Sequence, residues 1–152
     1  MLAKIFSAAV LGINAYIVEV EAHLESQLPA FATVGLPDSA VRKSRERVNA
    51  AIKNSNLPFP QKRITINLAP ADIKKEGSSY DLPIAIGILA ASGVVSQDHL
   101  DDFVILGELS LDGSLRPPSM ARCPLPWRLV RISTKAWCCH LRTQARQLWP
   151  TA

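Results

Sequence analysis

The sequence predicts an α+β fold in which helices cover one face of a mixed β-sheet. The first observation is an alternation of apolar and polar residues, typical of strands, within residues 4–35 and again in residues 63–68. The second is an amphipathic helical pattern after Asp38, and the third is a run at residues 82–91 that is apolar on every side. The expected order is β-β-β-α-β-α-β-β in a chain of 152 residues, about one domain in length.

The first elements are a predicted β-hairpin and a third strand. Residues 4–10 and 15–24 are rich in valine, isoleucine and alanine, with a turn at residues 12–14. Residues 31–35 follow as a short strand. Asp38 then caps a helix whose apolar face comprises Val41, Ser44, Val48, Ala51 and Ile52 and which ends near residues 54–56.

The remaining elements follow in the same way. Residues 63–68 alternate as a strand, and residues 82–91 form a helix that is buried on most faces. Residues 103–106 are predicted to be a strand. Asp112-Gly113, flanked by leucines, indicates a hairpin.

The composition excludes several protein classes. With 48% hydrophobic and 20% charged residues, the chain is neither collagen-like nor disordered throughout. No stretch approaches the roughly 20 apolar residues of a membrane span. The N-terminus resembles a signal peptide only loosely, because no small-residue cleavage site follows its apolar run. We therefore expect a cytoplasmic protein with no membrane partner.

The basic charge and all the cysteines lie in the C-terminal tail. Residues 1–118 hold 11 Lys and Arg against 13 Asp and Glu, whereas residues 119–152 hold 6 against none. The net charge of +4 is therefore a property of the tail. The run Cys138-Cys139-His140 lacks a second pair of ligands for a tetrahedral zinc ion, so no metal site is expected.

Four segments carry a resemblance to a known family. They are residues 31–38 (FATVGLPD), 66–77 (INLAPADIKKEG), 80–85 (YDLPIA) and 106–113 (LGELSLDG). Around them, residues 1–117 resemble the N-terminal domain of the magnesium-chelatase-like AAA+ ATPases of the competence type, the ComM and YifB family. The resemblance implies a sandwich shared with the Lon protease proteolytic domain and with the second domain of ribosomal protein S5. It also implies that residues 1–117 are a ChlI-type, Lon-like domain that is incomplete.

The resemblance further implies a motor that this chain lacks. Full-length members, which are bacterial and cytoplasmic, carry a module that binds ATP and Mg²⁺, assembles as a hexamer and, in the competence branch, drives branch migration of DNA during natural transformation. A phosphate-binding loop needs a Gly-x-x-x-x-Gly-Lys-Ser/Thr run, and this sequence has none. We therefore expect a non-catalytic accessory domain with no cofactor of its own.

The tail departs from the family pattern, and the genetic code suggests why. Residues 122–128 (RCPLPWR), read one nucleotide earlier, permit Ala-Leu-Pro-x-Ala-Met-Ala. In the same frame the codons of residues 137–139 force valine and then leucine. Because both resemble the family's continuation, we predict that the coding frame slips near Pro117-Pro118 and that residues 118–152 are poorly ordered. A genuine basic tail is the alternative.

Ser79 is the candidate catalytic residue. The resemblance to Lon-type proteases is local: these place a serine after a Lys-Asp-Gly run at the start of a buried helix, and residues 75–79 (KEGSS) are similar. A serine needs a base within reach, and where the proteases place their lysine this chain has residues 119–121 (SMA). The alternative is that Ser78 or Ser79 caps the helix at residues 82–91.

The first helix carries the candidate contacts to nucleic acid. These residues are Arg42, Lys43, Arg45, Arg47 and Lys53. Lys62, Arg63, Lys74 and Lys75 extend the positive charge, enough for salt-sensitive contacts to phosphate. A solvated helix face and a surface for neighbouring subunits are the alternatives. No aromatic residues alternate with these cations, so base stacking is not predicted.

Two function classes follow, with a third outcome beside them. As an accessory domain of a DNA-remodelling ATPase, the chain is expected to bind DNA weakly or to oligomerise, without turnover. As a relic Lon-type serine peptidase, it would cleave unfolded protein and lose that activity in Ser79→Ala. A truncated product without a cellular role is compatible with the same residues.

Overall fold

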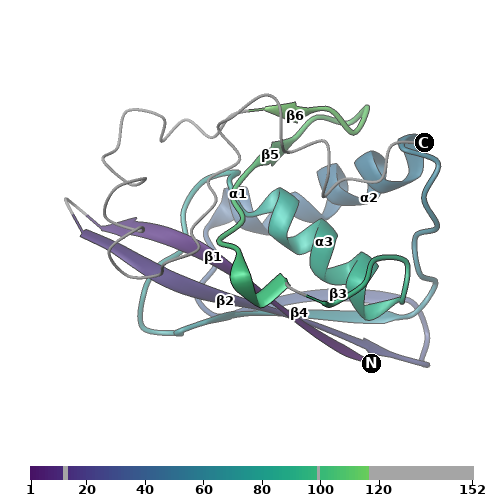
Figure 1. The fold of residues 1–152 in the computed structure, drawn as a ribbon, viewed down its shortest axis with the longest axis horizontal. Helices are drawn as coiled ribbons and strands as arrows, with labels where there is room; N and C mark the ends of the chain where they lie inside the picture. The colour runs from purple at the N-terminus through teal and green to yellow at the C-terminus, as the bar shows by residue number, and fades with distance from the viewer. Residues whose placement is uncertain (12–13, 99, 117–152) are drawn as a thin grey trace.

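A computed structural model describes residues 1–11, 14–98 and 100–116, in which a four-stranded sheet carries helices on one face (Figure 1). The strands of this sheet are β1 (Leu2–Leu11), β2 (Asn14–Glu25), β3 (Ala30–Val34) and β4 (Arg63–Ala69). Their order is β1-β2-β4-β3, with β3 parallel to β4 and the other pairs antiparallel. The predicted mixed sheet of an α+β fold is confirmed. The remaining elements are α1 (Ser39–Arg42), α2 (Ser44–Asn54), α3 (Asp81–Ala91), the 3-10 turn η1 (Leu100–Asp102), β5 (Glu108–Leu109) and β6 (Leu115–Arg116).

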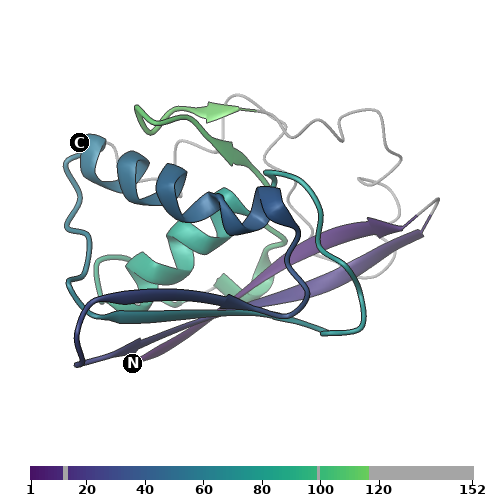
Figure 2. The same cartoon turned by 180° about the vertical axis from the view of Figure 1, so that it is seen from behind.

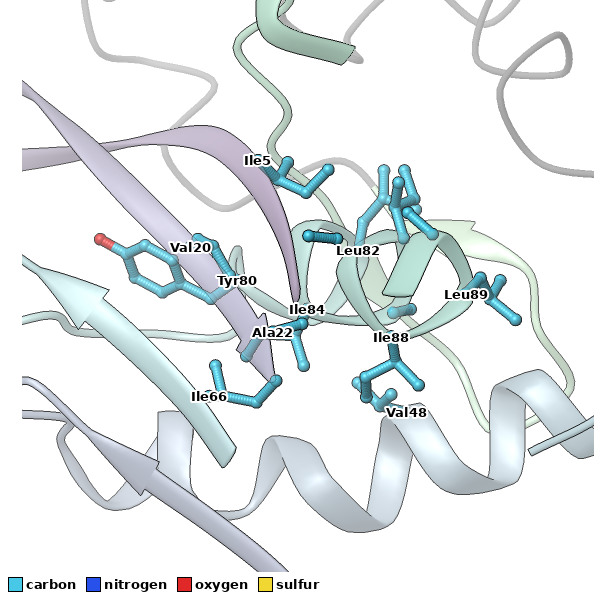
Figure 3. Packing of buried hydrophobic residues seen from close by; sticks show 14 of the residues in the cluster. Ile5, Val20, Ala22, Val48, Ile66, Tyr80, Leu82, Ile84, Ile88 and Leu89 are labelled. Carbon is cyan, nitrogen blue, oxygen red and sulfur yellow. The ribbon is translucent and has the colours of Figure 1, made fainter. Parts of the chain in front are cut away.

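Cross-strand register builds the buried face of the sheet. Ile5 of β1 lies opposite Val20 of β2, and Val20 lies opposite Leu68 of β4. All three side chains are buried, and Figure 3 shows the first two within the core. The alternate positions carry charges on the other face, where the ammonium of Lys4 lies 2.6 Å from the carboxylate of Glu19. One buried and one solvated face is the pattern expected of a largely antiparallel sheet.

The two longer helices lie on the same side of the sheet (Figure 2). Every residue of α3 is buried, as its uniformly apolar sequence predicted. This helix packs on β1 and β2, and Gly87 permits the close approach, because a β-carbon there would lie 3.2 Å from that of Ala22. Helix α2 packs beside α3 and buries Val48 and Ile52, so the core lies between the sheet and this helical layer.

The first predicted helix is divided in two at Lys43. Asp38 caps α1 as predicted, since its carboxylate accepts a hydrogen bond from the backbone N–H of Val41 at 2.7 Å. The backbone N–H of Glu46 then donates to the carbonyl of Lys43 at 3.3 Å, a three-residue spacing that tightens the turn. Helix α2 ends at Asn54, inside the predicted range.

The strand predicted at residues 103–106 is wrong in extent. Val104 makes a single bridge to Phe6 on β1, and the N–H of Ile105 donates to the Phe6 carbonyl at 2.8 Å. The chain then turns toward α3, where the N–H of Gly107 donates to the carbonyl of Ser79 at 2.9 Å, so the pairing with β1 extends no further. The predicted hairpin at Asp112-Gly113 is confirmed by the antiparallel pair β5 and β6.

Several predictions fall on residues 117–152, which lie outside the described part of the chain. They are that the reading frame slips, that the basic tail is poorly ordered and that Cys138-Cys139-His140 does not bind a metal ion. All three stay predictions. None of the helices in residues 1–11, 14–98 and 100–116 has the length and apolarity of a membrane span. Within the same residues, no three or more His, Cys, Asp or Glu side chains gather in a group that could hold a metal ion.

Candidate nucleic-acid interface

Four of the five predicted cations are exposed along α1, α2 and the residue between them. Arg42 ends α1, Lys43 joins the two helices, and Arg45 and Lys53 project from α2. Asn49 stands between the last two, four residues from each, and residues at this spacing share one face of a helix. Arg45, Asn49 and Lys53 therefore form a stripe along α2 with an exposed cation at each end. The assignment of these cations to nucleic acid stays a prediction.

This stripe forms one wall of a groove with a volume of about 160 Å³. The other wall comes from the start of β3 and from the segment that leads into β4. The polar and aromatic side chains of the lining are Phe31, Arg45, Asn49, Lys53, Phe59, Gln61 and Lys62. The described lining contains no aspartate or glutamate, so its charge is positive throughout. Parallel pairing of β3 with β4 sets Phe31 beside Ile64 at the base of the groove.

Two cations of the stripe lie over aromatic rings of the groove. The guanidinium carbon of Arg45 is 5.9 Å from the centre of the Phe31 ring, and the ammonium of Lys53 is 6.0 Å from the centre of the Phe59 ring. Both distances are at the outer limit of about 6 Å for a cation–π contact, so the cations are only loosely held. Glu46 approaches Arg45 at 3.8 Å, but both side chains are more than half exposed and such a pair is weak.

Sequence reasoning missed the aromatic part of this groove. It predicted no base stacking because no phenylalanine lies among the helical cations, yet the fold brings Phe31 and Phe59 to them from other segments. It named Lys62 among the cations that extend the positive charge, but it missed Asn49 as part of the lining. The helical spacing of Arg45, Asn49 and Lys53 is visible in the sequence and could have indicated a single stripe.

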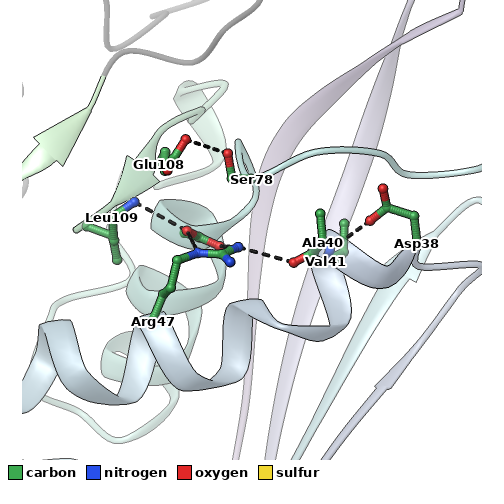
Figure 4. A network of polar contacts seen from close by, with 8 residues as sticks. Asp38, Ala40, Val41, Arg47, Ser78, Glu108 and Leu109 are labelled. Atoms are coloured by element: carbon green, nitrogen blue, oxygen red, sulfur yellow. Dashed lines mark hydrogen bonds and ion pairs between the residues drawn. The ribbon is translucent and has the colours of Figure 1, made fainter. Parts of the chain in front are cut away.

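Arg47, the fifth predicted cation, does not belong to this surface. Its side chain turns inward and makes two hydrogen bonds to the carboxylate of Asp81, from Nε at 2.6 Å and from the second guanidinium nitrogen at 2.8 Å (Figure 4). The guanidinium also donates to the carbonyl of Ala40, and the backbone N–H of Leu109 donates to Asp81 at 3.3 Å. Arg47 therefore supplies no free cation to this surface, because its charge is already paired inside the fold.

The electrostatics of this buried pair follow from its setting. The Asp81 side chain is fully buried, while that of Arg47 is 24% exposed. The hydrogen bonds to Asp81 raise the pKa of Arg47, so the guanidinium stays charged. Burial raises the pKa of Asp81, and the bonds from Arg47 and Leu109 oppose that rise. The pair ties α2 to the start of α3 and to β5.

Lys75 also does not lie on the basic surface that the sequence predicted. Its side chain is buried and its ammonium donates to the carbonyl of Pro70. Burial lowers the pKa of Lys75. The backbone N–H of Asp38 donates to the carbonyl of Lys75 at 3.0 Å, and the backbone N–H of Lys75 donates to the carbonyl of Leu36 at 3.2 Å. Lys75 therefore holds the loop before α3 against the loop before α1.

Ser79 lies in a setting that does not activate it. The residue is 5% exposed, and no hydrogen bond between described residues reaches its hydroxyl group from a base. Lys75, the nearest preceding lysine, directs its ammonium to Pro70. The alternative role as a helix cap is also wrong, because α3 begins at Asp81 without a capping side-chain bond. Ser78 instead donates from its hydroxyl to the carboxylate of Glu108 at 2.5 Å.

Comparison with known proteins places the chain in a family. Residues 20–124 match the family described as subunit ChlI of Mg-chelatase. The chain is 50% identical over 115 residues to the uncharacterized protein YifB of Escherichia coli, and 49% identical over 115 residues to the competence protein ComM of Haemophilus influenzae. An uncharacterized protein of Mycobacterium bovis is 45% identical over 116 residues.

Each of these alignments covers 76% of the chain and 23% of the relative, so the chain spans about a quarter of the length of these relatives. The family match at residues 20–124 contains the motifs at residues 31–38 and 66–77 on which the resemblance was based. Because the family match takes in more than half of its residues, the chain belongs to the magnesium-chelatase ChlI family, with YifB and ComM as its relatives.

Proposed function

We propose that this chain is a non-catalytic accessory domain of a magnesium-chelatase-like AAA+ ATPase and that it contacts DNA through the groove beside α2. The observation that carries the proposal is the groove itself, with three cations and no carboxylate in its described lining. Positive charge without internal neutralisation attracts phosphate and gives binding that weakens with salt. The relative from Haemophilus influenzae, competence protein ComM, supports a setting in competence.

In this proposal the ATPase module lies in a part of the full-length protein outside this chain. In this proposal a module outside the chain binds ATP and Mg²⁺, forms a hexameric ring and drives branch migration of DNA during natural transformation in the cytoplasm. The residues present do not fit the nucleotide, because the sequence has no phosphate-binding loop. The shared sandwich with the Lon proteolytic domain and ribosomal protein S5 is part of the same proposal, supported by a mixed sheet covered on one face by helices.

Charge removal in the groove tests the DNA contact. We expect the double variant Arg45→Gln with Lys53→Gln to lose at least tenfold in affinity for a DNA oligonucleotide at low salt. Losing two phosphate contacts should reduce the slope of log affinity against log salt by about 1.4 to 1.8. Fluorescence anisotropy of the full chain at several salt concentrations measures both quantities.

A matched control removes two cations from elsewhere. Lys4 and Lys74 are exposed and each pairs with a glutamate, at 2.6 Å and 2.7 Å respectively, so Lys4→Gln with Lys74→Gln changes the net charge equally. We expect this control to keep the original salt slope. Equal losses in the two double variants would show that only net charge matters, and no binding by the original chain would refute the DNA contact.

The peptidase alternative makes a separate prediction. Because Ser79 is buried and no base reaches its hydroxyl among the described residues, we expect the full chain to leave unfolded casein intact. Ser79→Ala should behave identically in the same assay, followed by gel electrophoresis over hours. Casein cleavage that disappears in Ser79→Ala would instead establish the relic peptidase.

A further inference from the structure

The groove beside α2 contains features that a simple phosphate-binding surface does not need. Two phenylalanine rings line it, one from β3 and one from the segment before β4. Aromatic rings bind nucleobases by stacking, and this works with any base because each has a π-face. Neither ring can reach a base that is paired and stacked inside a duplex.

The loosely held cations fit the same ligand. Arg45 and Lys53 lie over the two rings at the outer limit of cation–π distances, and their charged groups reach the solvent. They can turn from the rings toward phosphates on either side of a base. Lys62 supplies a third cation on the opposite wall. A strand that places one base in the groove therefore meets positive charge on both sides of that base.

Asn49 provides a polar group at the centre of the stripe. Its side-chain oxygen is buried and has no hydrogen-bond partner among the described residues. A buried acceptor without a donor is unfavourable, and rotation of the Asn49 side chain into the groove that it lines lets a donor on a ligand satisfy it. Every nucleobase has an N–H donor on its Watson–Crick edge, and in a duplex that donor is occupied by the opposite base.

The size of the groove sets the size of the ligand. Its volume of about 160 Å³ lies below the roughly 300–1,000 Å³ of pockets that enclose a drug-sized ligand. One planar ring system fits this scale better than a whole nucleotide or the face of a duplex. The absence of acidic groups from the described lining suits a polyanion on either side of that ring.

From these observations we propose that the groove receives one unpaired nucleobase of a single DNA strand. Phe31 and Phe59 stack against the base, Asn49 accepts a hydrogen bond from its Watson–Crick edge, and the cations bind the flanking phosphates. This inference rests on the proposed DNA contact and makes it selective for single-stranded regions. An acidic protein segment would be bound by charge alone and would not need the rings or the amide.

The test compares strands on the full chain. A 12-nucleotide single strand with one 2-aminopurine and a duplex of the same sequence are titrated with the original chain and with Phe59→Leu. We expect at least fivefold tighter binding of the single strand, and a fall in 2-aminopurine fluorescence as the base stacks. Phe59→Leu should lower single-strand affinity at least fivefold and leave duplex affinity within about twofold.

Two further variants separate stacking from effects on folding. Phe6→Leu is the matched control, because Lys4 lies over the Phe6 ring at 5.4 Å in a pair of the same kind on β1, away from the groove. It should leave both affinities unchanged. Asn49→Ala should lower single-strand affinity roughly fivefold through the lost hydrogen bond and spare the duplex.

The outcomes distinguish the two proposals. If neither strand form binds, the DNA contact itself fails. If both forms bind equally, or if Phe59→Leu and Asn49→Ala change neither affinity while Arg45→Gln with Lys53→Gln still weakens binding, the DNA contact stands and the base pocket is refuted. Competition by polyglutamate that displaces the single strand as readily from Phe59→Leu as from the original chain would also refute the pocket.

Discussion

Replacing Arg47 by methionine is expected to lower the free energy of unfolding by about 3–5 kcal/mol, because it leaves the buried carboxylate of Asp81 without its cation. The backbone N–H of Leu109 still donates to that carboxylate but cannot replace two charged hydrogen bonds. Urea denaturation followed by circular dichroism at neutral pH measures the loss. A domain of ordinary stability, about 5–15 kcal/mol, would be left marginal.

The matched control for this variant is Arg42→Met. Arg42 is an exposed cation on the same helical stretch and has no ion pair among those of the described residues, so its replacement should change stability by less than about 0.5 kcal/mol. Adding Asp81→Asn to Arg47→Met should recover part of the loss, since the neutral amide removes the buried charge. Similar losses for Arg42→Met and Arg47→Met would contradict the buried-pair account.

The pH dependence of the Arg47→Met deficit has a definite sign. Burial raises the pKa of Asp81 in the folded protein, and the variant lacks the guanidinium that opposes this rise. A raised pKa favours the folded state below the unfolded pKa of about 3.9, and this stabilisation is lost as the pH rises through the folded value. The deficit of Arg47→Met relative to the original chain should therefore grow from acidic to neutral pH.

The position of Arg47 at the border of a buried helix face is visible in the sequence, but its ion pair is not. Its position, three residues after the buried Ser44 and four before the buried Ala51, placed it at the border of the apolar face. Counting cations treated it as exposed, although one acidic residue at the start of an otherwise apolar helix, Asp81, was a visible candidate partner. No local pattern joins two residues 34 positions apart, so the pair emerged only from the packing of α2 on α3.

Local patterns predicted the parts of the fold that depend on local periodicity. The alternation in β2 and β4 and the uniform apolarity of α3 identified the buried residues correctly. The strand predicted at residues 103–106 did not form in full, because an apolar run becomes a strand only where a sheet edge is available along its whole length. Here the chain leaves β1 after one bridge. The groove was not predicted because its walls come from separate segments. Phe31 lies on β3 and Phe59 precedes β4, and only the fold brings their rings to Arg45 and Lys53 on α2.

Gly35 lies within the motif at residues 31–38, at a position where the fold leaves no room for a side chain. Its φ of +93° lies in a region that residues with a β-carbon rarely adopt. A β-carbon there would also lie 2.1 Å from the carbonyl oxygen of Leu68, a backbone atom that cannot move aside without distorting β4. This single glycine therefore lets the chain pass from β3 over the neighbouring strand into α1.

We expect Gly35→Ala to lower the free energy of unfolding by about 3 kcal/mol or more, since backbone strain of about 1–3 kcal/mol adds to the clash. Gly93→Ala is the matched control: Gly93 has a φ of +80°, but a β-carbon there would meet no atom within 4 Å. It should cost about 1 kcal/mol, the strain alone. Urea denaturation of both variants isolates the contribution of the clash as their difference. Equal losses would show that the approach of Gly35 to β4 is not what requires glycine in this motif.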